Sequence, residues 1–173
     1  DRYKGQDVIP AWVADMDFKS PPCVIEALER RVHEGAFGYT GVDDATYDAI
    51  ISFLKRHYDW EIQKEWILFT HGVVSSMNLA CLSVESKSVM TTTPIYPHFI
   101  KAPAYANKEI LAIEMKEENH RWTLDFEAME KAITPECKLF MLCNPYNPAG
   151  TVFTCKELEP LSSFCLKHGL TIC

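Results

Sequence analysis

The stretch that decides the fold is Cys143-Asn144-Pro145-Tyr146-Asn147-Pro148-Ala149-Gly150-Thr151. A mostly apolar run, 138–142, leads into it, and a helix signal begins just after it at Thr154. Each Asn-Pro pair restricts the backbone, because proline fixes its own φ and disfavours helix in the residue before it. The pattern predicts a buried strand, a rigid loop and a helix, with Asn147 at the carboxyl end of the strand. Open α/β sheets bind ligands at that end of their strands.

The composition is typical of a soluble globular protein, with 47% hydrophobic and 24% charged residues in a chain of 173. The net charge of −7 argues against nucleic acid as a partner, because phosphate binding needs a basic surface. No signal peptide and no run long enough to span a bilayer stands out, so no membrane partner is expected. The seven scattered cysteines form no Cys-x-x-Cys pair, which disfavours a metal site and indicates a reducing, cytoplasmic location.

Both ends of the sequence look cut. The chain begins at Asp1 without a methionine, and residues 170–173 have the pattern of a strand that has just begun. We therefore expect the chain to be part of a longer protein.

Helix and strand signals alternate along the chain, which predicts an α/β fold with a parallel sheet and right-handed crossovers. Strands are expected at 66–69, 88–92, 108–113, 138–142 and from 170 onward, and 116–122 is expected to be a polar surface loop. Helices are expected after the N-caps Ser20, Asp43 and Asp125, after Gly72, and after Thr154, which forms a capping box with Glu157. The first of these helices is expected to end at Gly35 and the last at Gly169.

The helix after Asp43 carries apolar residues at helical spacing. These positions predict a buried stripe made of Tyr47, Ile50, Ile51, Leu54 and Tyr58.

Gly72, Val73 and Val74 stand between the predicted strand 66–69 and a helix. The N-terminus of a helix presents free backbone N–H groups and favours an anion, and glycine lets the backbone approach a ligand closely. This turn is therefore a candidate phosphate site. A single glycine before a helix is also compatible with an ordinary turn.

Two tyrosines lie in predicted loops. Tyr96 lies between Pro94 and Pro97 after the strand 88–92, and Tyr39 lies in a glycine-flanked loop. The alternative readings are a core aromatic for Tyr96 and a cover over a helix end for Tyr39.

Residues 144–150 resemble the Asn-Pro-x-Asn-Pro-x-Gly signature of fold-type I pyridoxal-phosphate (PLP) enzymes, the aminotransferase superfamily. Residues 12–18, Trp-Val-Ala-Asp-Met-Asp-Phe, resemble the N-terminal arm of the MalY/PatB-type cystathionine β-lyases, or C–S lyases. The resemblance implies the PLP-dependent transferase fold, a mostly parallel sheet with helices on both faces, here truncated. Residues 1–40 would form an arm, helix and loop, and 41–173 the first part of the large PLP-binding domain.

The resemblance implies PLP as the cofactor and gives roles to the candidate residues. Gly72, Val73 and Val74 would hold its phosphate, Tyr96 would stack on its pyridine ring, and Asn147 would hydrogen-bond its phenolic oxygen.

Three further expectations follow from the same resemblance. Tyr39 would reach the PLP phosphate of the partner subunit in a homodimer, and Asp15 lies in the arm near the amino-acid substrate. The family's Schiff-base lysine, its aspartate for the pyridine nitrogen and its carboxylate-binding arginine are expected beyond Cys173. No residue of this chain is therefore assigned a catalytic role, and the chain alone is expected to be inactive.

The resemblance implies a C–S β-lyase that converts cystathionine or cysteine-S-conjugate amino acids to thiol, pyruvate and ammonia. A class I/II aminotransferase is the alternative, because the visible residues are common to both reactions. A non-catalytic fragment that binds PLP or a partner is a third hypothesis. A Rossmann-type nucleotide site is disfavoured, because no Gly-x-Gly-x-x-Gly follows a strand.

Overall fold

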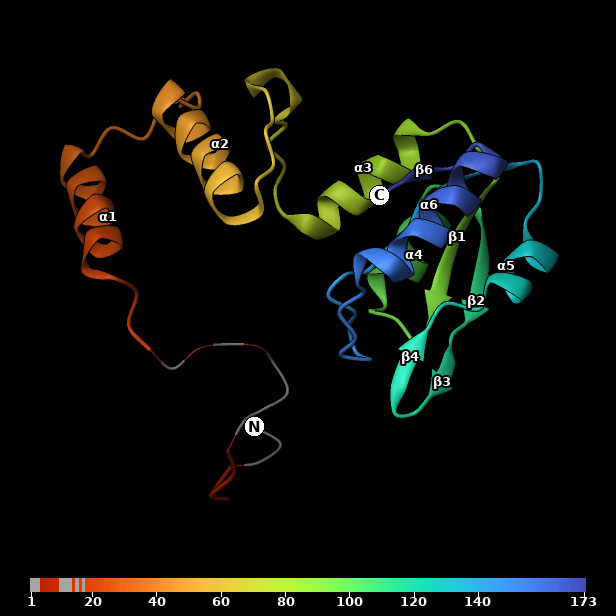
Figure 1. The fold of residues 1–173 in the computed structure, drawn as a ribbon. Helices are drawn as coiled ribbons and strands as arrows, with labels where there is room; N and C mark the ends of the chain where they lie inside the picture. Colours follow the sequence, from red (N-terminus) through yellow and green to blue (C-terminus); the bar gives the residue numbers. More distant parts are fainter. Residues whose placement is uncertain (1–3, 10–13, 15, 17) are drawn as a thin grey trace. The chain divides into compact units, whose positions relative to one another are not determined.

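The computed structural model describes residues 4–9, 14, 16 and 18–173 (Figure 1). The chain divides into two compact units, Asp1–Ile67 and Leu68–Cys173. The described part of the first unit contains helices α1 (Pro22–Glu34) and α2 (Asp44–Tyr58) and the 3-10 helix η1 (Lys64–Trp66). The second unit contains all the strands that the structure describes.

Helix α1 ends as predicted at Gly35, which adopts the left-handed conformation with φ 72°. Its start differs from the prediction, because Pro21 and not Ser20 occupies the N-cap and no side chain caps the helix. Pro21 and Pro22 already fix φ near helix-compatible values, and a proline at the first helical position has no N–H that needs a cap.

Helix α2 begins as predicted, because the Asp43 carboxylate accepts a hydrogen bond from Thr46 N at 2.9 Å. The predicted stripe is half-buried at 47, 50, 51 and 54. The prediction is wrong for Tyr58, which is 67% exposed. Tyr58 is the last helical residue and lies edge-on to Phe53, which is itself exposed.

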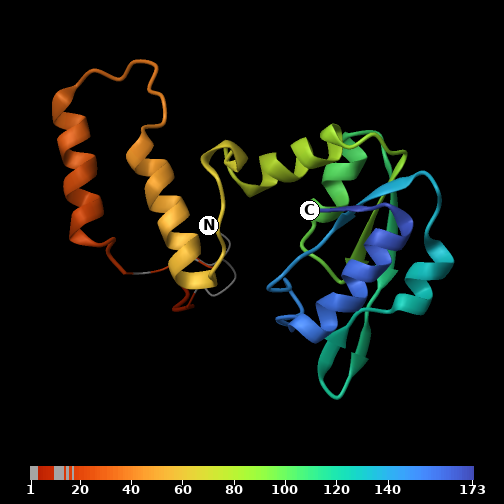
Figure 2. The same ribbon diagram turned by 45° about the horizontal axis from the view of Figure 1, so that its top comes forward.

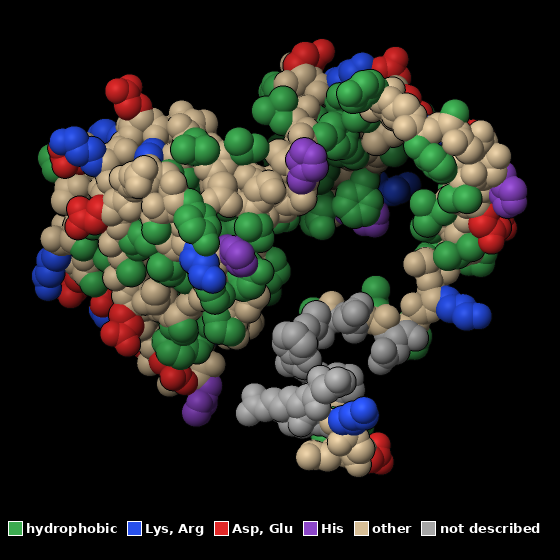
Figure 3. Space-filling view, turned by 180° about the vertical axis from the view of Figure 1, so that it is seen from behind, with side chains coloured by type: hydrophobic (Ala, Val, Ile, Leu, Met, Phe, Trp, Pro, Cys, Tyr) green, Lys and Arg blue, Asp and Glu red, His purple; other side chains and the backbone are tan. Residues whose placement is uncertain are grey.

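The Asp1–Ile67 unit has no buried side chain among its described residues. The apolar side chains of α1 are exposed: Val24, Ile25, Leu28 and Val32. Figure 3 shows apolar side chains at the surface of both units.

The predicted strand 66–69 is wrong. Trp66 ends η1, and the residues that follow it form neither helix nor strand. The described sheet does not include this segment, so its backbone has no ladder of hydrogen bonds to hold it. Leu68 is 88% exposed, so apolar composition alone did not make this segment a strand.

The Leu68–Cys173 unit is built on a parallel sheet with strand order β2-β1-β5-β6. The four strands are β1 (Ser88–Thr93), β2 (Glu109–Glu114), β5 (Cys137–Met141) and β6 (Thr171–Ile172). Each lies within about one residue of its predicted position. The predicted α/β fold class is confirmed.

Helices cover both faces of this sheet (Figures 1 and 2). They are α3 (Val73–Ser83), α4 (His98–Tyr105), α5 (Phe126–Ala132) and α6 (Cys155–His168). Successive residues of a strand point to opposite faces. Val89 accordingly packs in the cluster that contains residues of α3 and α4, whereas Met90 packs in the cluster that contains residues of α5 and α6. Helix α4 was not predicted.

The predicted loop 116–122 is a β-hairpin, formed by β3 (Lys116–Glu118) and β4 (Arg121–Thr123). Asn119 and His120 connect the strands with φ 52° and 60°. A two-residue turn with positive φ at both positions matches the twist of a hairpin. The turn was not predicted, because the polar composition of the segment was interpreted as a loop.

The predicted helix caps of this unit are confirmed. Asp125 accepts from Ala128 N at 3.0 Å, and Thr154 forms the capping box with Glu157. Gly169 ends α6 with φ 64°. Among the helices that the structure describes, none has both the length and the apolar content needed to cross a bilayer.

Candidate functional site

Three loops of the Leu68–Cys173 unit carry the predicted ligand-binding residues. Strands β1 and β5 are parallel neighbours, so the loops that follow them leave from adjacent carboxyl ends. Helix α3 precedes β1 and is joined to it by the short segment 84–87, and Gly72 is the N-cap of α3. The loops after β1 and β5 carry Tyr96 and Asn147, and Gly72 precedes α3.

A backbone hydrogen bond joins two of these loops. The N–H of Tyr96 donates to the carbonyl of Asn147 at 2.9 Å. The Tyr96 ring is 37% exposed and its centroid lies 5.0 Å from that of His98. The structure therefore brings Tyr96 and Asn147 together, and His98 packs beside the ring.

The two asparagines of the Asn-Pro-x-Asn-Pro loop differ in their contacts. The Asn144 side chain accepts the N–H of Phe153 at 3.1 Å and so closes the loop on itself. The Asn147 N–H donates to the Cys143 sulfur at 3.3 Å, and its carbonyl accepts from Tyr96. Within the described part of the chain, the exposed Asn147 side chain has no recorded hydrogen-bond partner, so it is available to a ligand.

Tyr146, between the two Asn-Pro pairs, is buried, with 2% of its surface exposed. Its hydroxyl donates to the Thr92 carbonyl at 2.7 Å and lies 2.8 Å from the Thr92 hydroxyl. The ring lies edge-on to Phe153 with centroids 6.0 Å apart. Burial raises the pKa of Tyr146 to about 12, so the phenol keeps its proton and remains a donor at neutral pH.

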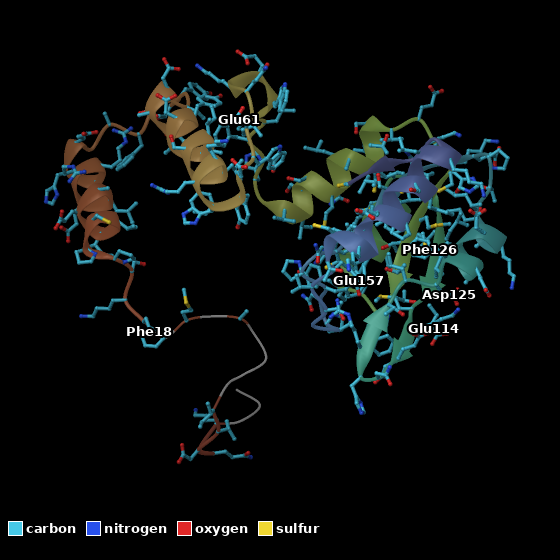
Figure 4. All side chains as sticks on the ribbon, in the orientation of Figure 1. Phe18, Glu61, Glu114, Asp125, Phe126 and Glu157 are labelled. Carbon is cyan, nitrogen blue, oxygen red and sulfur yellow. The ribbon has the colours of Figure 1, made fainter. Side chains whose placement is uncertain are left out.

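Arg121 of the β3–β4 hairpin contacts the end of the loop after β5 and the first turn of α6. The Arg121 guanidinium donates to both carboxylate oxygens of Glu157, at 2.9 and 2.8 Å, and to the carbonyl of Val152 at 2.8 Å. Glu157 is labelled in Figure 4. The pKa of Glu157 is lowered to about 2. The hydrogen bond from Arg121 is the largest cause, and the hydrogen bond from Thr154 N–H is the next largest.

In the turn before α3, Gly72 adopts a positive φ of 121°. A Cβ at Gly72 would meet no atom of the chain within 4 Å, so it is the positive φ, and not crowding by the chain, that requires glycine. The first recorded helical bond runs from Ser76 N to Gly72 O at 3.1 Å. The N–H groups of Val73 and Val74 precede it and have no carbonyl within the helix to receive them.

The Ser76 hydroxyl is already engaged. It lies 2.6 Å from the Thr70 hydroxyl, and each hydroxyl lies 3.3 Å from the Gly72 carbonyl oxygen, so one hydroxyl donates to the other and the second donates to the carbonyl. These bonds brace the turn from within.

Tyr39 and Asp15 belong to the other unit, Asp1–Ile67. Tyr39 is fully exposed in the Asp1–Ile67 unit, on a segment without helix or strand. Asp15, like most of the arm 12–18, lies outside the described residues. In the described ranges no group of three His, Cys, Asp or Glu side chains is arranged to hold a metal ion.

Three residues that support the loop after β5 were not predicted from the sequence: Cys143, Tyr146 and Arg121. The first two lie inside the recognised loop, and their flanking prolines signalled rigidity but not which side chain turns inward. Arg121 meets Glu157 across 36 positions of sequence, and no local pattern reports such a contact.

The family model for class I and II aminotransferases matches residues 9–173, so the chain belongs to this family. Its similar proteins include cystathionine β-lyase PatB of Bacillus subtilis (strain 168), with 35% identity over 96% of this chain and 44% of PatB. The resemblance to the aminotransferase superfamily and to its MalY/PatB branch is confirmed.

Two solved structures support the same assignment. A PLP-bound putative aminotransferase from Clostridium difficile 630 has TM-score 0.87 and 35% identity, and the match covers 99% of this chain and 45% of that one. Cystalysin from Treponema denticola, whose structure contains PLP, has TM-score 0.88 and 32% identity, with 97% and 43% covered. The chain thus spans about half the length of these relatives.

Proposed function

We propose that the protein is a PLP-dependent C–S β-lyase that acts on cystathionine or related cysteine-S-conjugate amino acids. The products would be a thiol, pyruvate and ammonia. The observation that carries the proposal is the Tyr96–Asn147 hydrogen bond, which joins two loops of the family pattern at the carboxyl edge of the sheet. The similarity to PatB favours the lyase reaction within the family.

The groups on these three loops match the three parts of PLP. The N–H groups of Val73 and Val74 at the start of α3 suit a phosphate, because a helix N-terminus attracts anions. The half-exposed Tyr96 ring suits the pyridine face, since stacked aromatic rings attract each other by about 0.5–1.5 kcal/mol beyond their buried area. The open Asn147 amide suits the phenolic oxygen.

When bound, PLP supplies an electron sink for the negative charge that develops at the α-carbon of an amino acid. The Asn147 side chain would donate a hydrogen bond to the ring oxygen and so stabilise its negative charge. Tyr96 would hold the plane of the ring, and the turn at Gly72 would fix the phosphate end. No lysine of this chain is assigned the proton transfer at the α-carbon.

A class I/II aminotransferase is the second candidate. The family model carries that description, and the Clostridium difficile relative is a putative aminotransferase. The residues identified at the sheet edge serve both reactions, so they do not separate the two candidates.

Two further roles belong to this proposal. We propose that the protein is a homodimer in which Tyr39 of each subunit contacts the phosphate at the partner's site, and that Asp15 lies near the amino-acid substrate. Mixing a Tyr39→Phe subunit with an Asn147→Ala subunit tests the first role. Hybrid dimers would contain one site with both native residues, and more activity than in either parent variant is expected. A cytoplasmic location is likewise a prediction.

The test is an assay of the whole protein with PLP on two substrate sets. Cystathionine is expected to yield thiol and pyruvate without a keto acid, and Asn147→Ala is expected to lower this rate. Turnover of an amino acid only with 2-oxoglutarate, without thiol release, would favour the aminotransferase. Absence of a visible PLP absorption band in the wild-type protein would overturn both candidates.

A further inference from the structure

Tyr146 links the two loops that carry the proposed ring-binding residues. It belongs to the loop after β5, but its hydroxyl donates to the carbonyl of Thr92, near the end of β1. Thr92 is itself buried, with 1% of its surface exposed, and lies four residues before Tyr96. The Tyr146 side chain therefore connects the loop after β5 to the end of β1, from which the loop with Tyr96 begins.

The backbone closes a ring of contacts around this link. Tyr96 N–H donates to the carbonyl of Asn147, the residue next to Tyr146. Tyr146 N–H donates to Thr151 O at 2.7 Å, and Gly150 N–H donates to Tyr146 O at 2.8 Å. The N–H, the carbonyl and the hydroxyl of Tyr146 are thus all hydrogen-bonded, and these bonds hold the residue in place.

A rigid phenol suits such a link. Its ring has few rotatable bonds, and burial against Phe153 restricts those that remain. Its hydroxyl faces the interior and is bonded to Thr92, so it is not available to a ligand at the sheet edge. Any influence of Tyr146 on the site must pass through Asn147 and Tyr96.

We propose that Tyr146 is a positioning residue which, by anchoring its hydroxyl on Thr92, sets the direction of the Asn147 amide relative to the Tyr96 ring. The inference rests on the proposed function for the identity of the ligand, PLP. The coupling between the loops is a property of the chain and can be tested without the ligand.

Tyr146→Phe is the test variant, because it keeps the ring and removes only the hydroxyl. Tyr105→Phe is the matched control, since Tyr105 ends α4 and is 71% exposed. Thr92→Val, which keeps the Thr92 carbonyl but removes its hydroxyl, is a second variant that weakens the same link from the other side.

The first measurement uses the PLP-bound whole protein and records the pH midpoint of the change in its visible absorption. A hydrogen bond from Asn147 stabilises the ionised ring oxygen, so losing it raises the midpoint. Tyr146→Phe is expected to raise the midpoint by about one unit, a tenfold change in the proton equilibrium. Thr92→Val is expected to raise it less, and Tyr105→Phe to leave it unchanged.

A double-variant cycle separates positioning from general loss of stability. In an Asn147→Ala background, Tyr146→Phe is expected to leave the midpoint where Asn147→Ala alone puts it. An equal shift in both backgrounds would overturn the proposal, as would a lowered melting temperature with an unchanged midpoint in the single variant.

The second measurement uses the PLP-free whole protein and follows hydrogen exchange at the Tyr96 amide. Faster exchange in Tyr146→Phe, about tenfold, with no change in Tyr105→Phe, is expected if the hydroxyl holds the two loops together. Unchanged exchange in Tyr146→Phe would overturn the coupling. A wild-type protein that binds no PLP would instead overturn the proposed function, and this second measurement would still decide the coupling.

Discussion

Each of the two units contains a helix that is capped at both ends, but the units differ in burial. In the Asp1–Ile67 unit, α2 begins at Asp43 with a side-chain cap and ends in a left-handed residue, yet none of its residues is buried. In the Leu68–Cys173 unit, α6 has a capping box and a left-handed Gly169, and it buries Leu161, Phe164 and Cys165.

The comparison shows that helix boundaries and helix packing have separate origins. Caps are satisfied by groups within a few residues, so sequence neighbours suffice to set them. Burial of an apolar face needs a second surface, and that surface comes from distant parts of the chain. In the Leu68–Cys173 unit the parallel sheet supplies it, with Leu139 and Phe140 facing opposite helix layers.

The largest expected difference between the units is in the cost of removing an apolar side chain. Phe140→Ala in β5 is expected to lower the free energy of unfolding by about 3–5 kcal/mol, because Phe140 has no exposed surface and its loss leaves a cavity. Leu28→Ala in α1, where Leu28 is 60% exposed, is expected to change it by less than about 0.5 kcal/mol. Urea unfolding of the 173-residue chain followed by circular dichroism measures both. Similar costs for the two variants would contradict the contrast.

The second difference is in the response to acid. The pKa of Glu157 falls from its ordinary 4.5 to about 2, mainly because Arg121 donates to it. A depressed carboxyl pKa stabilises the folded state above pH 4.5, and this contribution is lost as the pH falls toward about 2. Wild-type melting temperature should therefore drop more steeply across this window than that of Glu157→Gln.

The matched control for this acid response is the exposed Arg31–Glu34 pair of α1. Glu34→Gln is expected to leave the pH profile of the melting temperature parallel to wild type, because exposed pairs contribute little. Parallel profiles for wild type and Glu157→Gln would show that the hairpin does not hold the loop by this ion pair.

A smaller difference is expected between two cysteines. Cys143 accepts the N–H of Asn147, whereas Cys23 is exposed in α1. Cys143→Ala should weaken PLP binding by the whole protein, measured by absorbance titration, by about 0.5–1.5 kcal/mol, the typical net contribution of one hydrogen bond. Cys143→Ser keeps an acceptor and should fall between wild type and Cys143→Ala. Cys23→Ala should match wild type, and an equal loss for Cys143→Ala and Cys143→Ser would argue against the sulfur as an acceptor.

The smallest difference concerns the helix caps Asp43 and Asp125. Asp43→Ala is expected to reduce the helical circular dichroism of the 173-residue chain, because α2 has no buried residue to hold it once the cap is lost. Asp125→Ala should lower the melting temperature slightly but retain the helix signal, since Met129 anchors α5 in the core. A larger loss of helical signal in Asp125→Ala than in Asp43→Ala would mean that a local cap contributes more to a helix that is packed in the core.

The sequence predicted the parts of the fold that depend on local chemistry. The strands of the sheet, the caps at Asp43, Asp125 and Thr154, and the left-handed ends at Gly35 and Gly169 all follow from neighbouring residues. The loop after β5 was also predictable, because two Asn-Pro pairs leave the backbone few alternatives.

Some errors arose where distant partners decide the outcome. The apolar segment 66–69 had the composition of a strand, but the sheet does not include it. The error at 116–122 was instead a local one, because the two-residue turn at Asn119 and His120 was not recognised within a polar segment. The anchoring of Tyr146 on Thr92 joins residues 54 positions apart, and only the register of the β1 and β5 strands brings them together.

We propose that the turn at Gly72 and the loops after β1 and β5 bind one PLP molecule. The decisive experiment is a crystal structure of the whole protein with PLP. The phosphate is expected at the Val73 and Val74 N–H groups, the Tyr96 ring on the pyridine face and the Asn147 amide on the ring oxygen. PLP bound elsewhere, or bound with the Asn147 amide directed away from it, would disprove the proposal.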